Sequence, residues 1–264
     1  MSVALHPLGY LLCGKQSDTP SEIDNILFRL NDTISKFTRK LLSANLLIED
    51  EREIAPFYAR TILEASGTAL LARIDPFRVL SVYKVQLSRN YDVTKRSNIA
   101  LQWTGDIIAA NKPKEDIWNP ENKVSDYDRA LLGNHFGELF WKPGFLNVID
   151  YISTYSDRQQ SEWTNKLEQK EETPFFETAK TEAIKLFSAF SKGVHYEFLV
   201  NTDSIYDATT VQDFTQRMLQ TISDLGLVSH FGGFMATALD KEDAYNYYLE
   251  IEEMVKSWRR RMDS

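Results

Sequence analysis

Apolar residues recur every three or four positions along most of this 264-residue chain. The clearest example lies between residues 22 and 43, where a helix that buries one face accounts for the spacing. The apolar positions of this run are Ile23, Ile26, Leu27, Leu30, Ile34, Phe37, Leu41 and Leu42. Alternation of apolar and polar residues, which is typical of half-buried strands, is nearly absent. We therefore expect an all-α fold, a multi-helix bundle of about eight to ten helices.

Cap and turn signals predict where several helices begin and end. Thr19-Pro20-Ser21-Glu22 predicts a helix start, with Thr19 as the N-cap and Pro20 at the first helical position. Asp75-Pro76 and Lys142-Pro143-Gly144 each predict a break between helices, because proline disfavours helical geometry in the residue before it. The remaining helices are expected over residues 51–73, 77–87, 96–110, 125–141, 145–155, 174–194, 209–227 and 241–262.

Three further segments are assigned from their composition. Residues 156–173 are charged and weakly amphipathic, which predicts a solvated helix or a connecting arm. The two glycines in residues 229–234 predict a chain reversal between helices. Residues 111–123 hold two prolines and no periodic pattern, so they are expected to form a loop. We expect one all-α domain over residues 1–264, with its candidate seam at this loop.

The composition argues against several functional classes. A single cysteine, Cys13, rules out a disulfide framework or a thiolate zinc cluster, and it is expected to be a small buried hydrophobe. The net charge of −8 argues against a surface that coats nucleic acid broadly, but it is compatible with a local basic cleft. No histidine has a glutamate three residues before it and no His-Glu-x-x-His motif is present, so no metal or other cofactor is expected. Carboxylate-only Mg²⁺ sites have no fixed spacing to search for.

Neither a membrane span nor an export signal is expected. The longest apolar stretch, residues 54–74, carries Arg60 and Glu64, which a membrane span would place near the middle of the bilayer. Residues 1–13 have no Lys or Arg before their apolar run, and no cleavage site follows it. We therefore expect a cytoplasmic protein.

The apolar stretch contains the first candidate site. Arg60 and Glu64 lie four apart on a helix that is apolar around most of its circumference, so we expect a buried ion pair. Buried ions need further polar partners to offset their lost hydration. A candidate source of partners is the helix that follows Thr173. Its polar residues on or beside one face are Ser188, Ser191, Lys192 and His195.

Two interpretations of this polar face remain open. In the first, it is a satisfied structural network that fixes the register of two helices. In the second, it contacts a phosphate or a nucleotide. Arg60 would then bind the anion with its guanidinium fork, His195 would move a proton and Glu64 would hold Arg60 in place.

The same residues carry a family resemblance. The segment Arg-Thr-Ile-Leu-Glu-Ala-Ser at 60–66, followed by Ser-Lys-Gly-Val-His at 191–195, resembles bacterial branches of the HEPN superfamily. Those proteins are helical bundles with an Arg-x-x-x-Glu helix and a later Ser-x-x-x-His helix. The resemblance implies that this bundle has an HEPN-like core.

A second candidate site is Arg129-Ala-Leu-Leu-Gly-Asn-His135, which matches the Arg-x(4–6)-His spacing of HEPN-type ribonucleases. The resemblance implies metal-independent RNA cleavage, in which the ribose 2′-hydroxyl attacks the adjacent phosphate. His135 would assist the proton transfers, Arg129 would stabilise the developing charge, and Asn134 would be a further polar contributor. Residues six apart on a regular helix point about 120° from each other, so Gly133-Asn134 would have to break the helix. Otherwise His135 is a partly buried helix-end histidine.

The resemblance implies an RNA-directed role in a toxin or anti-phage defence setting. The first hypothesis is a metal-independent endoribonuclease, with two copies facing each other in a homodimer. The alternative is a non-catalytic adaptor, sensor or neutralising protein partner built on the same bundle. The closing Arg259-Arg260-Arg261 fits either a basic helix C-terminus or an RNA-binding patch.

Overall fold

The computed structural model describes residues 6–15, 20–87, 131–133, 136–154, 161–192, 206–233 and 235–262 of the chain. Every regular element in these ranges is helical, which confirms the all-α bundle. The α-helices are α1 (Pro7–Cys13), α2 (Glu22–Ser43), α3 (Glu49–Ile74), α4 (Pro76–Gln86), α7 (Lys142–Thr154), α8 (Glu162–Glu168), α9 (Glu172–Lys192), α11 (Ala208–Ser229) and α12 (Lys241–Met262). A π-helical segment, η1 (Gly137–Trp141), leads directly into α7.

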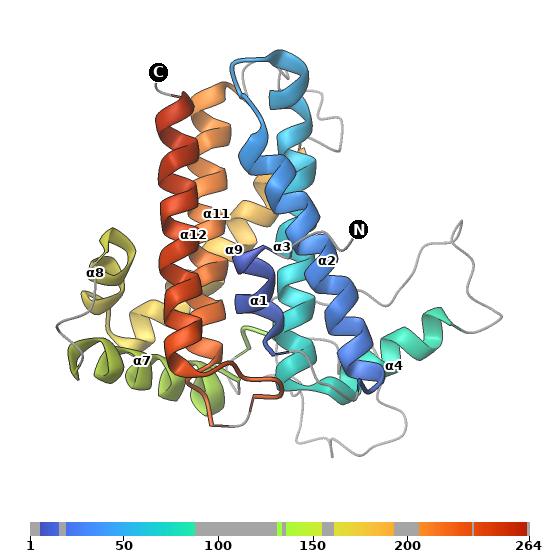
Figure 1. Ribbon diagram of the computed structural model, residues 1–264, viewed down its shortest axis with the longest axis vertical. Helices are drawn as coiled ribbons and strands as arrows, with labels where there is room; N and C mark the ends of the chain where they lie inside the picture. The colour runs from blue at the N-terminus through green and yellow to red at the C-terminus, as the bar shows by residue number, and fades with distance from the viewer. Residues whose placement is uncertain are drawn as a thin grey trace, which may run out of the picture.

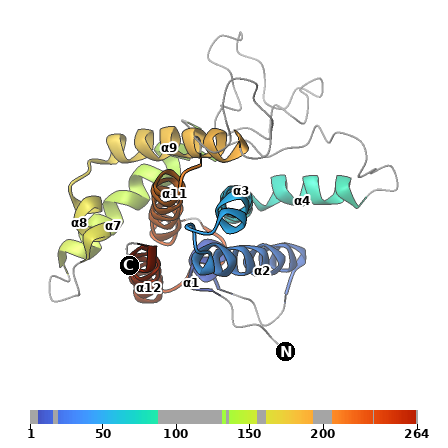
Figure 2. The ribbon, with the colours of Figure 1, turned by 90° about the horizontal axis from the view of Figure 1, so that it is seen from above.

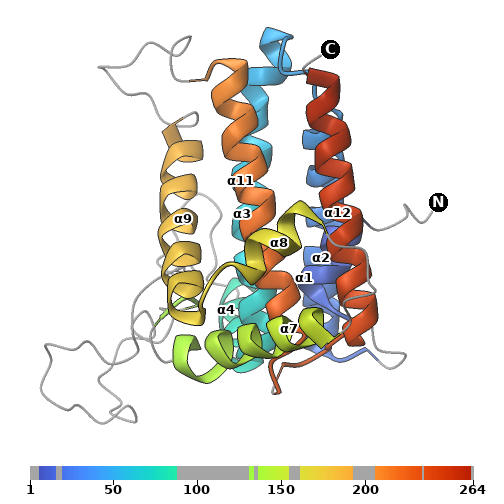
Figure 3. The ribbon, with the colours of Figure 1, turned by 90° about the vertical axis from the view of Figure 1, so that its left-hand side faces the viewer.

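Four long helices, α2, α3, α11 and α12, run lengthwise through the molecule (Figure 1). The short α1 packs among all four of them. Seen from above, α4 extends outward from the end of α3 (Figure 2), and its Lys84 Nζ lies 3.5 Å from Glu22 Oε2 at the start of α2. The remaining long helix, α9, lies alongside α3 and α11, while α7 crosses their lower ends (Figure 3). This arrangement brings the middle of α3 next to the second half of α9.

The helix α2 starts two residues later than predicted. The N-cap is Ser21 and not Thr19: Ser21 Oγ accepts from the Asp24 backbone N–H, and Asp24 Oδ2 accepts from the Ser21 backbone N–H. Thr19 and Ser21 both favour an N-cap, and each has an acidic residue three positions later, Glu22 and Asp24 respectively, so the sequence pattern fits either start. The predicted apolar row of this helix is confirmed, with Ile34 and Leu41 fully buried.

The second predicted helix is confirmed and is longer than expected. It is α3, which ends at Ile74 before Asp75-Pro76, and α4 begins at that proline. Helices α1, α2, α4, α9 and α11 all contact α3. An apolar sequence on most sides suits such a central position, because a helix with neighbours on several sides has to bury several faces.

The predicted break at Lys142-Pro143-Gly144 is wrong, because these residues form the first turn of α7. A proline is tolerated in a first turn, where its missing N–H would have no intrahelical acceptor. Gly144 has a packing role there. A Cβ at this position would lie 2.9 Å from the Val228 carbonyl oxygen, so the glycine lets α7 approach α11 closely.

Residues 161–168 are more buried than the sequence suggested. Ser161 forms a capping box with Thr164 at the start of α8. Trp163, Thr164 and Leu167 are buried, so α8 is docked on the bundle and is not a solvated helix. A helix as short as α8 has too few apolar residues to give a clear periodic pattern, so the sequence did not predict the burial of Trp163 and Leu167.

One core cluster of buried apolar residues extends from Leu8 to Trp258. None of the helices in the described ranges is long and apolar enough to cross a membrane. The expected helix over 96–110, the 111–123 seam and residues 125–130 of the expected helix over 125–141 lie outside the described residues.

Candidate functional site

The packing of α3 against α9 brings Arg60 next to the helix that follows Thr173, as predicted. The guanidinium carbon of Arg60 lies 5.0 Å from the centroid of the Phe187 ring on α9. This distance is within the range of a cation–π contact. Arg60 Nε also donates to Glu64 Oε1 at 3.2 Å. Arg60 is therefore held by a carboxylate on its own helix and by an aromatic ring on α9.

The expected burial of this ion pair is wrong. The side chain of Arg60 is 24% exposed and that of Glu64 is 50% exposed. Their surface of α3 also includes Ile54 and Phe57, which are 41% and 45% exposed. An apolar composition around the helix therefore did not mean burial around the helix, because this face of α3 has no described helix packed fully over it. The pair is a surface contact that solvent and ligands can reach.

The predicted polar residues of α9 lie in its last two turns. Ser188 and Lys192 are exposed, and Ser191 is partly buried. Ser191 Oγ donates to the Phe187 carbonyl oxygen at 2.6 Å, so this hydroxyl is satisfied within its own helix. His195, which follows α9 in the chain, lies outside the described residues. The structure thus brings together Arg60, Glu64 and the α9 turn that contains Ser188 and Ser191.

Of the second candidate site, residues 129–135, the structure describes residues 131–133. Arg129, Asn134 and His135 lie outside the described residues. Between them, Leu131 and Leu132 are buried, and the Leu131 carbonyl oxygen accepts from Trp141 Nε1 at 2.7 Å. The catalytic roles expected for Arg129, Asn134 and His135 therefore stay predictions.

A second arginine of α3, Arg73, is the centre of a buried polar network that the sequence analysis missed. Its side chain is fully buried. Arg73 Nε donates to the Ala236 carbonyl oxygen at 3.1 Å. Nη1 donates to Ser229 Oγ at 2.6 Å and to the Leu12 carbonyl oxygen at 3.3 Å. Nη2 lies 3.0 Å from His230 Nδ1.

His230 completes this network as a neutral side chain. Its Nδ1 accepts from the Leu239 backbone N–H at 3.0 Å, so the proton is assigned to Nε2, which lies 2.7 Å from the Leu11 carbonyl oxygen. Burial, with the Arg73 guanidinium beside it, holds the pKa of His230 well below its usual range. The chain reversal predicted at residues 229–234 is confirmed for residues 230–233, which follow the end of α11 at Ser229. His230 is a buried hydrogen-bonding group of this turn and is not placed to transfer protons to a ligand.

Cys13 is buried beside this network, as predicted for a small hydrophobe. Burial raises the pKa of the Cys13 thiol to about 12, although the nearby Arg73 cation acts in the opposite direction. Burial lowers the pKa of Arg73 to about 10, so this arginine remains a cation at neutral pH. A thiol with so high a pKa is not a nucleophile under ordinary conditions.

A second buried polar cluster lies where α11 and α12 meet α8. Tyr248 donates to Asp224 Oδ1 at 2.6 Å, and Lys170 Nζ lies 3.5 Å from Asp224 Oδ2. Burial raises the pKa of Asp224 to about 6, against the opposing effects of Lys170 and Tyr248. Glu252 of α12 is 1% exposed and accepts from the Trp163 backbone N–H at 3.2 Å. This cluster holds α8 on the bundle.

The basic segment Arg259-Arg260-Arg261 at the end of α12 contacts the end of a neighbouring helix. Arg261 Nη2 donates to the Leu42 carbonyl oxygen at 2.6 Å, in the last turn of α2. This contact agrees with the interpretation of Arg259-Arg260-Arg261 as a basic helix terminus, although the carbonyl belongs to a neighbouring helix. Among the described residues, no group of three or more His, Cys, Asp or Glu side chains is arranged to hold a metal ion.

Comparisons of this chain with protein-family models, with curated proteins and with solved structures found no match.

Proposed function

We propose that this chain is an HEPN-like helical protein that cleaves RNA without a metal ion, with Arg60 and His195 as its reacting pair. The observation that carries the proposal is the state of Arg60. Its Nε is held by Glu64, and its Nη1 and Nη2 groups make no hydrogen bond to any described residue. A guanidinium that is oriented on one side and free on the other suits phosphate binding, because its fork matches two phosphate oxygens.

The chemistry follows from those groups. The ribose 2′-hydroxyl attacks the adjacent phosphate while His195 accepts its proton, and the 5′-oxygen of the next nucleotide leaves as it takes that proton from the His195 imidazolium. Arg60 stabilises the additional negative charge on the phosphate oxygens. Glu64 is a positioning residue, since it touches Arg60 and not the substrate.

The test is cleavage of labelled total RNA in EDTA by the purified chain. We expect products that end in 2′,3′-cyclic phosphate, and a rate that falls roughly 100-fold or more in His195→Ala and in Arg60→Met. Arg217→Met is the matched control, because Arg217 is also a partly exposed arginine bound to carboxylates, Glu182 and Asp213. Cleavage that depends on His135 and not on His195 would assign the reaction to the Arg129/His135 pair instead.

The alternative is a non-catalytic adaptor, sensor or neutralising partner, and one observation favours it. The described polar groups around Arg60 are satisfied within single helices: Glu64 binds Arg60, and Ser191 binds the Phe187 carbonyl oxygen. Such pairing within a helix is common where polar side chains have only a structural role and bind no ligand. Absence of RNA cleavage under every condition, with the wild-type chain folded, would support this alternative. Light scattering of the same samples tests the expected homodimer.

A further inference from the structure

We propose that an apolar patch on α2 and α3, formed by Phe37, Ile54, Phe57 and Tyr58, is an interface with a second copy of this chain. The two helices lie side by side along the molecule (Figure 1). The patch gives an interface to the homodimer that accompanies the proposed function, but it is inferred from exposed side chains and not from RNA chemistry. RNA cleavage by a monomer would disprove the interface and leave the proposed function standing.

The patch is continuous across the two helices. The ring centroid of Phe57 lies 6.0 Å from that of Phe37 and 6.0 Å from that of Tyr58, and the Phe37 and Tyr58 centroids are 5.7 Å apart. Ile54 precedes Phe57 by one helical turn, so their side chains are neighbours on α3. Both Ile54 and Phe57 are more than 40% exposed. Adjoining large apolar side chains in contact with water mark an interaction surface more strongly than scattered ones.

Charges of opposite sign flank the patch on its two sides. On the α2 side, Lys36 Nζ lies 5.9 Å from the centroid of the Phe37 ring, and Lys40 Nζ lies 5.4 Å from that of Tyr58. On α3, Glu53 is exposed. Residues advance by 100° around a helix, so Glu53 points about 140° away from Tyr58 and lies on the flank that is turned away from α2.

These charges are not paired within the described part of the chain. Neither the two lysines nor Glu53 forms a hydrogen bond or an ion pair with a described residue, whereas Glu64 on the same helix binds Arg60. The aromatic rings separate the lysines from Glu53 within one copy. Their pairing therefore requires a second molecule.

A two-fold axis makes this surface complementary to itself. An axis that runs along α3 past Phe57 places the α2 flank of each copy against the α3 flank of the other. Lys40 of each copy then faces Glu53 of the other, and the two Phe57 side chains pack together between these pairs. Arg60 points to the Glu53 side of Phe57, so it lies at the rim of the interface and remains open to a phosphate. A nucleic acid or a peptide of one charge sign would match only one flank, so a second copy fits the surface better.

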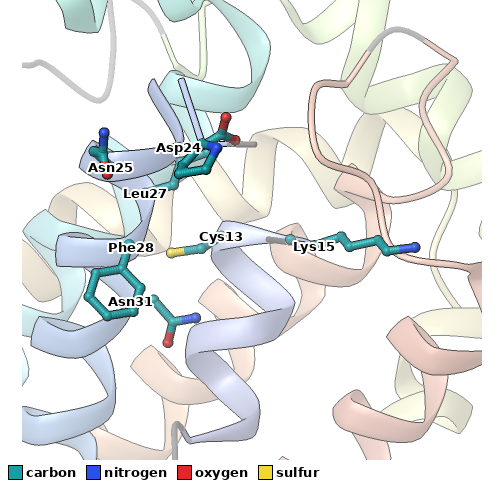
Figure 4. Close-up of a pocket in the computed structure, with 9 residues that line it drawn as sticks. Cys13, Lys15, Asp24, Asn25, Leu27, Phe28 and Asn31 are labelled. Atoms are coloured by element: carbon teal, nitrogen blue, oxygen red, sulfur yellow. The ribbon is translucent and has the colours of Figure 1, made fainter. Parts of the chain in front are cut away.

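The opposite side of α2 offers a matched control. Phe28 precedes Phe37 by nine residues, which places it about 180° away around the helix. It is 52% exposed and lines a pocket of about 170 Å³ between α1 and α2, where it lies near Cys13 and Asn31 (Figure 4). Phe28 is thus an exposed aromatic residue of the same helix that lies outside the patch.

Sedimentation equilibrium of the full-length chain tests the interface. We expect a dimer with a dissociation constant in roughly the micromolar range. Phe57→Ser should weaken association roughly tenfold or more, because a central aromatic side chain contributes much of the binding energy of such an interface. Phe28→Ser should leave association unchanged. Circular dichroism checks that each variant remains helical.

Charge reversal tests which residues face each other. Lys40→Glu and Glu53→Lys should each weaken association roughly three- to tenfold, because each change creates two like-charged contacts in a symmetric dimer. The double variant restores opposite charges and should associate more tightly than either single variant, a recovery that a folding defect does not produce. The proposal is overturned if the wild-type chain is monomeric at about 100 µM. It is equally overturned if Phe57→Ser associates as tightly as the wild type, or if the double variant associates no more tightly than the single variants.

Discussion

At the residue scale, Arg73 is a buried cation that is held by backbone carbonyl groups and uncharged side chains. None of the ion pairs of the described residues includes Arg73, and its acceptors are two carbonyl oxygens, a hydroxyl and a histidine nitrogen. Leu12 lies in the last turn of α1, and Ser229 is the last residue of α11. Helix C-termini carry a partial negative charge and unpaired carbonyl groups, both of which favour a cation. Arg73 therefore joins the ends of α1, α3 and α11.

We predict that Arg73→Met lowers the free energy of unfolding by about 3–5 kcal/mol, because it leaves several buried acceptors unpaired. Denaturant unfolding followed by circular dichroism gives this value. Arg60→Met is the matched control on the same helix. Since Arg60 belongs to a partly exposed ion pair, its loss should cost about 1 kcal/mol or less. Similar losses in the two variants would contradict the assignment of Arg73 as the central cation.

At the scale of elements, the helices of this chain could be predicted because helical periodicity is a local property. The spacing of Ile34 and Leu41 on α2 depends on the residues around them, whatever packs on the other side. The error at Lys142-Pro143-Gly144 was also local, since the sequence alone does not separate a proline that ends one helix from a proline in the first turn of the next.

The candidate site could be predicted in part. The sequence placed Arg60 near Ser188 and Ser191, and α9 does pack there. It did not distinguish the two arginines of α3. Arg60 and Arg73 both lie in an apolar run, and burial of the second depends on residues far away in the chain, such as Leu12 and Ser229. Sequence patterns do not contain such non-local contacts, so the buried arginine was assigned to the wrong position.

The short α8 gives a prediction at the same scale. A helix of seven residues is not stable alone, so α8 depends on its docking. Glu252 accepts from the backbone N–H of Trp163, one of the unpaired donors in the first turn of α8. Glu252→Ala should therefore raise amide hydrogen exchange in residues 162–168 at least tenfold, with α2 and α3 unchanged. The control is Glu253→Ala, whose side chain is 58% exposed on the same helix. Unchanged exchange in α8 would show that its apolar contacts suffice.

At the scale of the whole molecule, buried histidines and a buried aspartate change the free energy of unfolding in opposite directions over the same pH range. Burial and the Arg39 charge lower the pKa of His6 to about 4, and His230 is shifted in the same direction. Both histidines are neutral in the folded chain, so the stability they contribute is lost as the pH falls below about 6.5. Asp224 acts in reverse. Its folded pKa of about 6 lies above the unfolded value, so its contribution is present below pH 4 and lost as the pH rises through 6.

These opposing signs predict the behaviour of Asp224→Asn, which resembles a permanently protonated Asp224. Tyr248, Lys170 and Glu252 surround this position, and the side-chain carbonyl oxygen of the introduced asparagine keeps the acceptor for Tyr248. The variant and the wild type should be about equally stable at pH 4. Above pH 7 the variant should be more stable by up to about 3 kcal/mol, because the wild-type chain then buries a charged carboxylate. Denaturant unfolding between pH 4 and 8 measures the difference, with Asp213→Asn, an exposed carboxylate of the same helix, as the control. A stability difference that stays constant across this range would mean that Asp224 does not retain its proton in the folded protein. The pH dependence of the free energy of unfolding would then be set by the histidines and the exposed carboxylates, with no contribution from Asp224 that stabilises the fold at low pH.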